Sequence, residues 1–236
     1  ATITNDAGRI LTDSSLTEVT IDLTAPEAPT IDVLTTRDST PVITGTTGTG
    51  VALAAGETLT VTVNGATYTV VPVSDGTWSL DLGTAATTSG ILGAIEPGNT
   101  YEVSAIASDA AGNTEPDVST NELIRVALPT VDALFSIDTT PTITGTTGTG
   151  EALSTGETLT VYVSGATYTV TPAADGTWSL DLSSATPTSG TPIALTDGAF
   201  EVVATITDAA DNVDSDASTN ELSVDTAAPT LDLDTD

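Results

Sequence analysis

Basic and sulfur-containing residues are almost absent from this sequence of 236 residues. It has no histidine, cysteine or methionine, and its three basic residues, all arginines, are set against 33 acidic ones, which gives a formal net charge of −30. Binding to a phosphate backbone depends on clustered lysine and arginine, and anionic membrane surfaces attract the same residues. The composition therefore excludes nucleic acid as a partner and argues against docking on an anionic membrane.

The missing residue types also limit the chemistry. Without cysteine there are no disulfides, thiolate metal sites or thiol nucleophiles, and without histidine the usual general base and transition-metal ligand are absent. Aromatic residues make up 3% of the chain, too few to build a sugar-stacking cleft around paired carboxylates. No segment approaches the roughly 20 apolar residues of a membrane span. We therefore expect neither enzymatic activity nor membrane insertion.

A long repeat runs through the chain. The segment "GETLTVTVNGATYTV" from Gly56 returns as "GETLTVYVSGATYTV" from Gly156, and "DGTWSLDL" from Asp75 returns from Asp175, an offset of 100 residues. Self-similarity at a fixed period is typical of tandem arrays.

The repeat predicts the domain organisation. Pro29, Pro129 and Pro229 mark three starts. We expect the C-terminal strands of a preceding repeat at 1–26, full repeats at 27–127 and 128–227, and the start of a further repeat at 228–236. A chain divided in this way reads as a window on a longer tandem array.

Each repeat carries the pattern of short β-strands. In "TLTVTVNGATYTV", Leu59, Val61 and Val63 alternate with threonines, and Asn64-Gly65 supplies the positive φ angles of a tight hairpin. Seven such runs are expected in the first full repeat: about 30–35, 41–46, 57–64, 67–73, 77–82, 100–107 and 118–126. Seven short antiparallel strands in about 100 residues predict an all-β fold of tandem immunoglobulin-like β-sandwich domains, head to tail and without the disulfide. Trp78 is expected to fill the core, the alternative being an exposed ligand platform.

The blocks "TLTVTVNGATYTV", "DGTWSLDL", "SDAAGN" and "TAP-APT" resemble the bacterial immunoglobulin-like repeats of giant calcium-dependent adhesins. In such RTX-type adhesins these repeats fill the long extender region, and the proteins are exported by type I secretion. The resemblance covers nearly the whole chain. It implies a structural extender, or stalk, module at the extracellular surface of a bacterium, with calcium at the domain junctions.

In the usual sandwich order, chain direction assigns each loop to one of two ends. The top end collects the incoming linker, the loop near 47–56, the Asp75-Gly76 turn and the 108–117 loop. The bottom end collects the 36–40 loop, Asn64-Gly65 and the 96–99 loop. In a head-to-tail array, the bottom end of one repeat meets the top end of the next.

These ends are rich in oxygen ligands of the kind that Ca²⁺ prefers, which binds about six to eight carboxylate, amide and carbonyl oxygens. Asp214 also stands at the top end of the second repeat. For a single aspartate, a turn or solubility role is the simpler interpretation. The loops "DAAGN" and "DAADN" together with an aspartate-bearing linker nevertheless favour calcium. The candidate ligands are Asp22, Asp38, Asp109, Asn113, Asp138, Asp208, Asp211, Asn212 and Asp225.

One linker departs from the pattern. It reads "LIRVALPT", with Arg125 and Val126 where its sisters read "VTIDLTAP" and "LSVDTAAP". The linker carboxylate is missing. Three interpretations stay open: fewer linker ligands, a more weakly held ion, or reliance on Asp208 and Asp211 of the following repeat. On any of them, this joint could be the more flexible one.

We expect the partners of each repeat to be its neighbours in the same chain, and the isolated fragment to be monomeric. Two other functions remain open. A ligand-binding adhesive module that recognises a glycan or protein predicts an exposed aromatic or apolar patch in one copy only. A self-associating component of a biofilm matrix or surface layer predicts assembly at high calcium.

Overall fold

A computed structural model describes residues 2–12 and 21–229 of the chain. Strands and loops make up this part of the protein, so the expected all-β fold is confirmed. No helix of the described residues is long and apolar enough to cross a membrane. Residue 1 and 13–20 of the expected preceding repeat, and 230–236 of the expected further repeat, lie outside the described residues.

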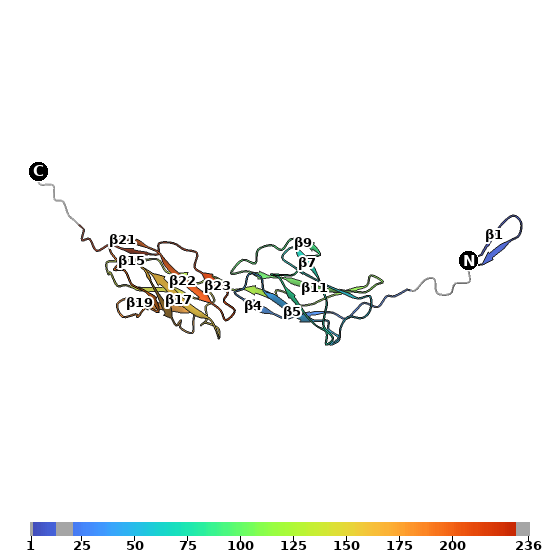
Figure 1. The fold of residues 1–236 in the computed structure, drawn as a ribbon, viewed down its shortest axis with the longest axis horizontal. Coiled ribbons are helices and arrows are strands. Elements are labelled where there is room, and N and C mark those ends of the chain that lie inside the picture. The colour runs from blue at the N-terminus through green and yellow to red at the C-terminus, as the bar shows by residue number, and fades with distance from the viewer. Residues whose placement is uncertain (1, 13–20, 230–236) are drawn as a thin grey trace.

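Two β-structures of similar size lie end to end along the longest axis of the molecule (Figure 1). The first is built from β3 (Thr30–Ile31), β4 (Leu34–Thr36), β5 (Val42–Thr46), β6 (Thr58–Val63), β7 (Ala66–Val70), β8 (Thr77–Asp81), β9 (Ser89–Gly90), β10 (Thr100–Tyr101), β11 (Val103–Ser108), β12 (Thr114–Pro116) and β13 (Leu123–Arg125). Near the N-terminus, β1 (Thr2–Thr4) and β2 (Ile10–Thr12) form a hairpin whose strand residues are all exposed.

The second β-structure repeats this order strand for strand. Its elements are β14 (Thr130–Val131), β15 (Leu134–Ser136), β16 (Thr142–Thr146), β17 (Thr158–Val163), β18 (Ala166–Val170), β19 (Thr177–Asp181), β20 (Ser189–Gly190), β21 (Gly198–Phe200), β22 (Val202–Thr207), β23 (Val213–Ser215) and β24 (Leu222–Val224).

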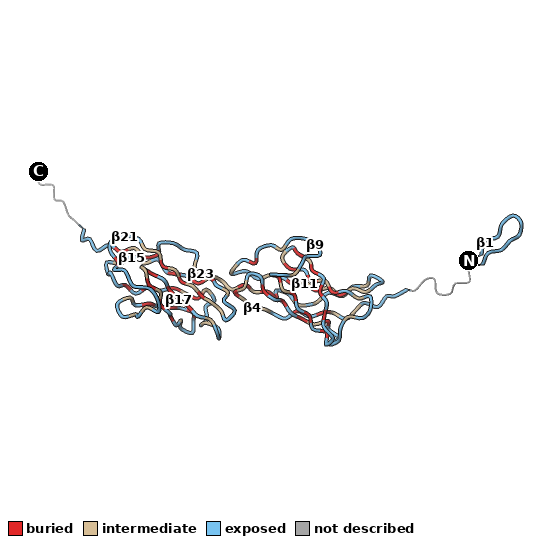
Figure 2. Tube along the Cα trace, in the orientation of Figure 1, coloured by how far each residue is buried: buried red, intermediate tan, exposed pale blue. Residues whose placement is uncertain are grey.

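Each β-structure contains one five-stranded and two three-stranded sheets. In the first, the orders are β12-β11-β6-β7-β9, β3-β5-β8 and β10-β13-β4, and the second has the same orders with its own strands. The buried residues form two separate clusters, one from Ile31 to Leu123 and one from Val131 to Val224. Figure 2 shows this burial as a red interior in each body, with exposed residues around it. We call the two bodies the first and second sandwich.

The expected alternation of apolar and polar residues along the strands shows which side chains form the core. Along β6, Leu59, Val61 and Val63 are buried while the threonines between them are not. The strand turns back into β7 through Asn64 and Gly65, whose φ angles of 39° and 89° close the two-residue hairpin. The hairpin prediction is confirmed.

Trp78 lies in the core, which excludes an exposed ligand platform. It is 3% exposed, and its indole N–H donates to the main-chain oxygen of Thr46 at 3.2 Å. Across the sheet it pairs with Gly45. A Cβ at that position would collide with the indole ring and with the main-chain oxygen of Thr30, so this glycine makes room for the ring.

The strand prediction was wrong in several particulars. The expected strand at 30–35 is two short strands in different sheets, and the expected strand at 100–107 divides in the same way into β10 and β11. β9 and β12 fall where loops were expected, and β13 covers only the end of 118–126. The pairing is not wholly antiparallel, because β4 runs parallel to β13. These strands of two or three residues are too short to show an alternating pattern.

Hydrogen bonds gather the loops at the ends of each sandwich. At the top end of the first sandwich, the N–H of Thr47 donates to the oxygen of Gly76 at 2.8 Å. At the bottom end, the N–H of Arg125 donates to Asn99 and that of Val126 to Thr36, at 2.9 and 3.1 Å. The bottom end of the first sandwich points at the top end of the second (Figure 1).

Candidate functional site: the junction between the sandwiches

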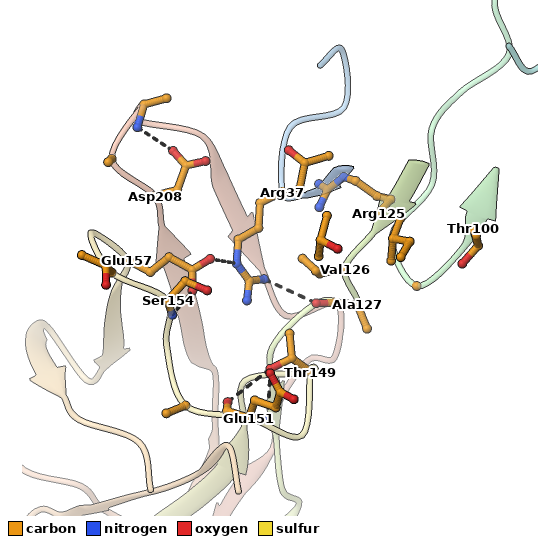
Figure 3. Close-up of a pocket in the computed structure, with 18 of the residues that line it drawn as sticks. Arg37, Thr100, Arg125, Val126, Ala127, Thr149, Glu151, Ser154, Glu157 and Asp208 are labelled. Atoms are coloured by element: carbon orange, nitrogen blue, oxygen red, sulfur yellow. Dashed lines mark hydrogen bonds and ion pairs between the residues drawn. The ribbon is translucent and has the colours of Figure 1, made fainter. Parts of the chain in front are cut away.

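The central junction is where the bottom end of the first sandwich, the linker at 126–129 and the top end of the second sandwich meet. An open cleft of about 680 Å³ lies there (Figure 3). One side is formed by the end of β4, by 98–100 and by β13, and the other by the loops at 149–157 and 208–210. The cleft is therefore built by both sandwiches.

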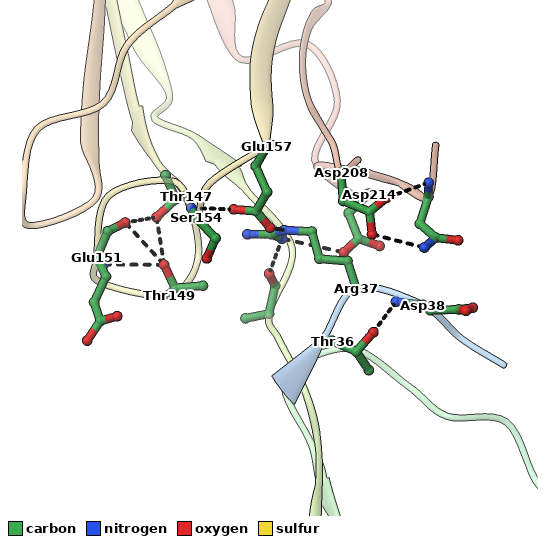
Figure 4. Close-up of polar contacts among 12 residues, drawn as sticks. Thr36, Arg37, Asp38, Thr147, Thr149, Glu151, Ser154, Glu157, Asp208 and Asp214 are labelled. Atoms are coloured by element: carbon green, nitrogen blue, oxygen red, sulfur yellow. Dashed lines mark hydrogen bonds and ion pairs between the residues drawn. The ribbon is translucent and has the colours of Figure 1, made fainter. Parts of the chain in front are cut away.

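Arg37 reaches from the first sandwich into the second. It directly follows β4, which is fixed by parallel pairing with β13. Its Nε donates to Oε1 of Glu157 at 2.6 Å, and its Nη1 lies 3.4 Å from Oδ2 of Asp214 and 3.5 Å from the main-chain oxygen of Ala127. Figure 4 shows the guanidinium between the two carboxylates. One side chain thus contacts the linker, the loop before β17 and strand β23 of the neighbouring sandwich.

Arg125 makes the second cationic contact. It is the last residue of β13, where it pairs with Thr36, the residue before Arg37. Its Nη1 donates to Oδ2 of Asp214 at 2.8 Å and its Nη2 to Oδ1 at 2.5 Å. This is the two-pronged geometry in which a guanidinium binds a carboxylate most strongly.

Asp214 is the carboxylate that both arginines share. It lies in the middle of β23, where it pairs with Ile206 of β22. Its exposed fraction is 4%, and those of Arg37 and Arg125 are 5% each. Two of the three basic residues in a chain of 33 acids are therefore buried against one carboxylate. With Glu157, two negative charges stand against two positive ones.

The linker is fixed on both sides of this ion-pair network. Val126 donates its N–H to Thr36 of the first sandwich, and Ala127 accepts from Arg37. On the other side, Gly148 of the second sandwich approaches Leu128 so closely that a Cβ would collide with the main-chain oxygen of Leu128. Val126, Ala127 and Leu128 are half-buried.

The expected ligands Asp208, Asp211 and Asn212 lie at the central junction, in a loop that closes on itself. Oδ1 of Asp208 accepts the N–H groups of Ala210 and Asn212, and Oδ2 accepts the side-chain amide of Asn212 at 2.9 Å. Burial alone would raise the pKa of Asp208, but these hydrogen bonds and the positive charge of Arg37 outweigh it and lower that pKa. Asp211 is exposed, with a φ of 64° that suits a turn.

Asp38 is beside the junction but does not enter the network. Its Oδ1 accepts the N–H of Thr40 at 2.8 Å, within its own turn. At the bottom end of the second sandwich Asp138 caps Thr140 in the same way, and Asp225 accepts the N–H of Ala227. These three aspartates hold local turns.

The first junction, between the linker at 21–29 and the top end of the first sandwich, brings three other expected ligands together. Asn113 donates its side-chain amide to the main-chain oxygens of Asp22 and Thr24, at 3.1 and 3.4 Å. The same amide donates to Oδ2 of Asp109 at 2.8 Å. The hydrogen bond from the Asn113 side chain lowers the pKa of Asp109, and main-chain N–H groups lower it further.

The two junctions differ in how well they suit a cation. Within residues 2–12 and 21–229, no group of three or more Asp or Glu side chains is arranged so that it could hold a metal ion. At the first junction one carboxylate and two main-chain carbonyls converge on the amide nitrogen of Asn113, and these three hard oxygens are of the kind that Ca²⁺ binds. At the central junction, guanidinium groups occupy the space between the carboxylates. A metal ion there would lie beside two fixed positive charges, so these residues do not fit one.

Sequence reasoning missed part of this site. It named the change at Arg125 and interpreted it as a lost ligand, and it placed Asp214 among the oxygen-bearing residues of the top end without including it in the candidate ligands. It attached no role to Arg37 or Glu157. The available signal was compositional, since two rare arginines both stand at the bottom end of the same repeat.

Comparisons with known proteins add the following. No family model matches the chain, and no curated protein does. Among solved structures, the chain is similar to one of a 1.5-MDa bacterial ice-binding adhesin, at 25% identity over 95% of this chain and 73% of the other, with a TM-score of 0.33. It is also similar to a tetra-tandem repeat in the extending region of a large adhesion protein, at 25% identity and a TM-score of 0.27. That match covers 95% of this chain and 55% of the other.

Proposed function

We propose that this chain is a spacer segment of an extended stalk, in which immunoglobulin-like sandwiches joined head to tail supply length. The observation that carries the proposal is the central junction. The second sandwich continues the long axis of the first (Figure 1), and Arg37, Arg125 and Asp214 are buried between them. The two arginines keep their buried carboxylate partner only while both surfaces stay in place, and a buried charge without its partner is costly. Such a joint favours one relative orientation, as a spacer requires.

The adhesin context follows from the resemblance of the sequence blocks to extender repeats. We accordingly propose an extracellular location at a bacterial surface, with the neighbouring repeats as the partners of each sandwich. RTX-type architecture and export by type I secretion belong to the same proposal.

Calcium is proposed for the first junction only. Asp109 and the main-chain oxygens of Asp22 and Thr24 would hold the ion in the place of the Asn113 N–H groups, with the Asn113 side chain turned to present its amide oxygen. The ion would supply a positive charge between acidic segments. In a chain with a net charge of −30, a cation at this point offsets repulsion between the linker and the loop at 109–113.

Small-angle scattering tests the spacer directly. The chain is expected to scatter as an elongated monomer whose maximum dimension does not depend on protein concentration. A compact or broadly flexible particle would contradict the proposal. Large complexes that grow with added calcium would instead indicate the self-associating matrix component.

A second candidate, the ligand-binding adhesive module, is favoured by one observation. Val71 and Val73 are 86% and 57% exposed beside a shallow cleft over Trp78, whereas the second sandwich has Thr171 and Ala173 at these positions. This is an apolar patch in one copy only. Replacing both valines by the residues of the second sandwich leaves the spacer intact, so a loss of surface adhesion in the Val71→Thr, Val73→Ala variant would favour the adhesive module.

A further inference from the structure

We propose that the central junction is an arginine clamp, formed by Arg37, Arg125, Asp214 and Glu157, which holds the two sandwiches together without a metal ion. The clamp requires carboxylates on the facing repeat end, at the positions of Asp214 and Glu157. The inference concerns this one joint and deepens the spacer function proposed above.

The first argument is that the cation is already present in the chain. A divalent ion at a junction neutralises carboxylates of two neighbouring repeats. Here Arg125 binds both oxygens of Asp214, and Arg37 bridges Asp214 and Glu157, with nitrogen–oxygen distances from 2.5 to 3.4 Å. The charges balance within the buried network. Guanidinium groups suit this role because they stay charged at every accessible pH and present donors in a planar fork.

The second argument comes from the equivalent positions in the other copy of the repeat. At the bottom end of the second sandwich, Val224 stands in the position of Arg125, paired with Ser136 as Arg125 is with Thr36. Ile137 stands in the position of Arg37. The top end of the first sandwich has Glu115 in place of Asp214. Both arginines and their shared aspartate therefore occur together at the central junction. The equivalent positions in the other copy of the repeat carry other residues.

The third argument is the cost of leaving a buried guanidinium without its carboxylate. A buried guanidinium that loses its carboxylate stays desolvated without compensation, so a repeat end lacking Asp214 is a poor neighbour for this one. The Nε of Arg125 has no hydrogen-bond partner although it is buried, which leaves the interaction of this side chain with Asp214 to compensate its burial. The pair of arginines thus depends on a carboxylate at the position of Asp214.

Because the chain has no cysteine, spin labels attach only to cysteines that are introduced for a distance measurement. Spin labels are attached at Val71→Cys and Thr171→Cys, exposed positions that directly follow β7 and β18, one in each sandwich. Pulsed electron paramagnetic resonance then gives the distribution of distances between the sandwiches. Each measurement is made in excess chelator, and that on the parent chain is repeated with calcium.

The labelled chain is expected to give one narrow distance peak in chelator, and added calcium should not sharpen it. Asp214→Ala should lose the narrow peak. The matched control Glu115→Ala, at the same position of the first sandwich, should keep it. A second variant combines Arg37→Ile with Arg125→Val, the residues that the second sandwich carries at these positions. Because the second sandwich folds with these residues, the variant should fold while lacking the clamp. It should also lose the narrow distance peak. Thermal melts followed by tryptophan fluorescence check that each variant is folded.

Three results would overturn the clamp, and they separate it from the spacer. A parent peak that is narrow only with calcium contradicts the clamp but leaves the spacer standing. A narrow peak that survives both the Asp214→Ala and the double-arginine variant does the same. A parent peak that is broad with and without calcium contradicts both.

Discussion

Arg125 donates through both of its terminal nitrogens to the two carboxylate oxygens of Asp214, a residue 89 positions further along the chain and in the other sandwich. This linker has Val126 where the other two have Asp22 and Asp225, and the residue before it is the cation whose carboxylate partner lies on the neighbouring repeat. At the joint for which greater flexibility was expected, both sandwiches bury charged side chains against each other.

The aspartate of the clamp should matter for stability as well as for orientation. Removing one partner of a buried ion pair costs up to roughly 3–5 kcal/mol, because the other charge stays buried without compensation. Asp214→Ala is therefore expected to lower the unfolding free energy by up to that amount, and by less if the junction opens and water hydrates the arginines. Differential scanning calorimetry should show this loss, with Glu115→Ala as the control. A thermogram of Asp214→Ala that matches the parent would contradict the ion-pair network.

Calcium should stabilise the first junction and leave the stability of the central junction unchanged. Extracellular calcium modules bind with dissociation constants of roughly 10⁻⁴ to 10⁻³ M, and free calcium at tenfold the constant adds about 1.4 kcal/mol per site. The melting temperature of the parent is expected to rise across a calcium series. Asp109→Ala should remove this response, whereas Asp208→Ala should keep it, because Arg37 already lies beside Asp208. Equal losses in both variants would show that the two loops bind calcium alike.

Acid should weaken the loops at 109–113 and 208–212. Hydrogen bonds lower the pKa of Asp109 and Asp208 in the folded protein. A carboxyl with a lowered folded pKa stabilises the fold above its unfolded pKa of about 3.9, and this contribution is lost as the pH falls through the folded value.

Asp208→Asn is accordingly expected to reduce the stability of the protein near neutral pH and to flatten its decline below about pH 4. Unfolding midpoints measured in denaturant across the acidic range check this. The exposed Glu151→Gln, which also removes one acid from a neighbouring loop, should follow the parent curve. If the two variants give the same curve, the hydrogen bonds of Asp208 do not stabilise the fold.

The close approach of Gly45 to Trp78 should make this glycine intolerant of substitution. A Cβ there collides with a backbone oxygen and with a buried ring, and overpacking of this kind costs roughly 1–3 kcal/mol or more. Gly45→Ala should therefore lower stability more than Gly50→Ala, where no atom lies within 4 Å of the added carbon and only the φ of 72° is unfavourable, at about 1 kcal/mol. Denaturation followed by tryptophan fluorescence ranks the two. A smaller loss at Gly45 would mean that the indole ring can move aside.

Much of the fold was predictable because its signals are local. The alternation of Leu59, Val61 and Val63 with threonines, and the Asn64-Gly65 turn, need only neighbouring residues to act. The repeat offset placed the corresponding strands of both copies. The parallel pairing of β4 with β13 was not predictable, because it joins short segments far apart in the chain and leaves no period in either.

The candidate site was predictable only in part. Asp109 and Asn113 lie with the linker at Asp22, as expected from the assignment of loops to the top end. Asp38, Asp138 and Asp225 instead use their carboxylates for their own turns, the simpler interpretation of an isolated aspartate. A sequence shows which residues stand at an end, but hydrogen bonds within a loop compete for the same oxygens that a metal ion would bind.

The sequence by itself determined that this chain is β-structured, repetitive, strongly acidic and without histidine or cysteine chemistry, because composition and short-range periodicity fix those properties. Only the tertiary structure decided how the acidic ends are joined. Arg37 and Asp214 are 177 positions apart, and their contact exists because two folded bodies bring a bottom end and a top end together. Electrostatic contacts depend on distance in space and on burial, neither of which spacing along a chain records.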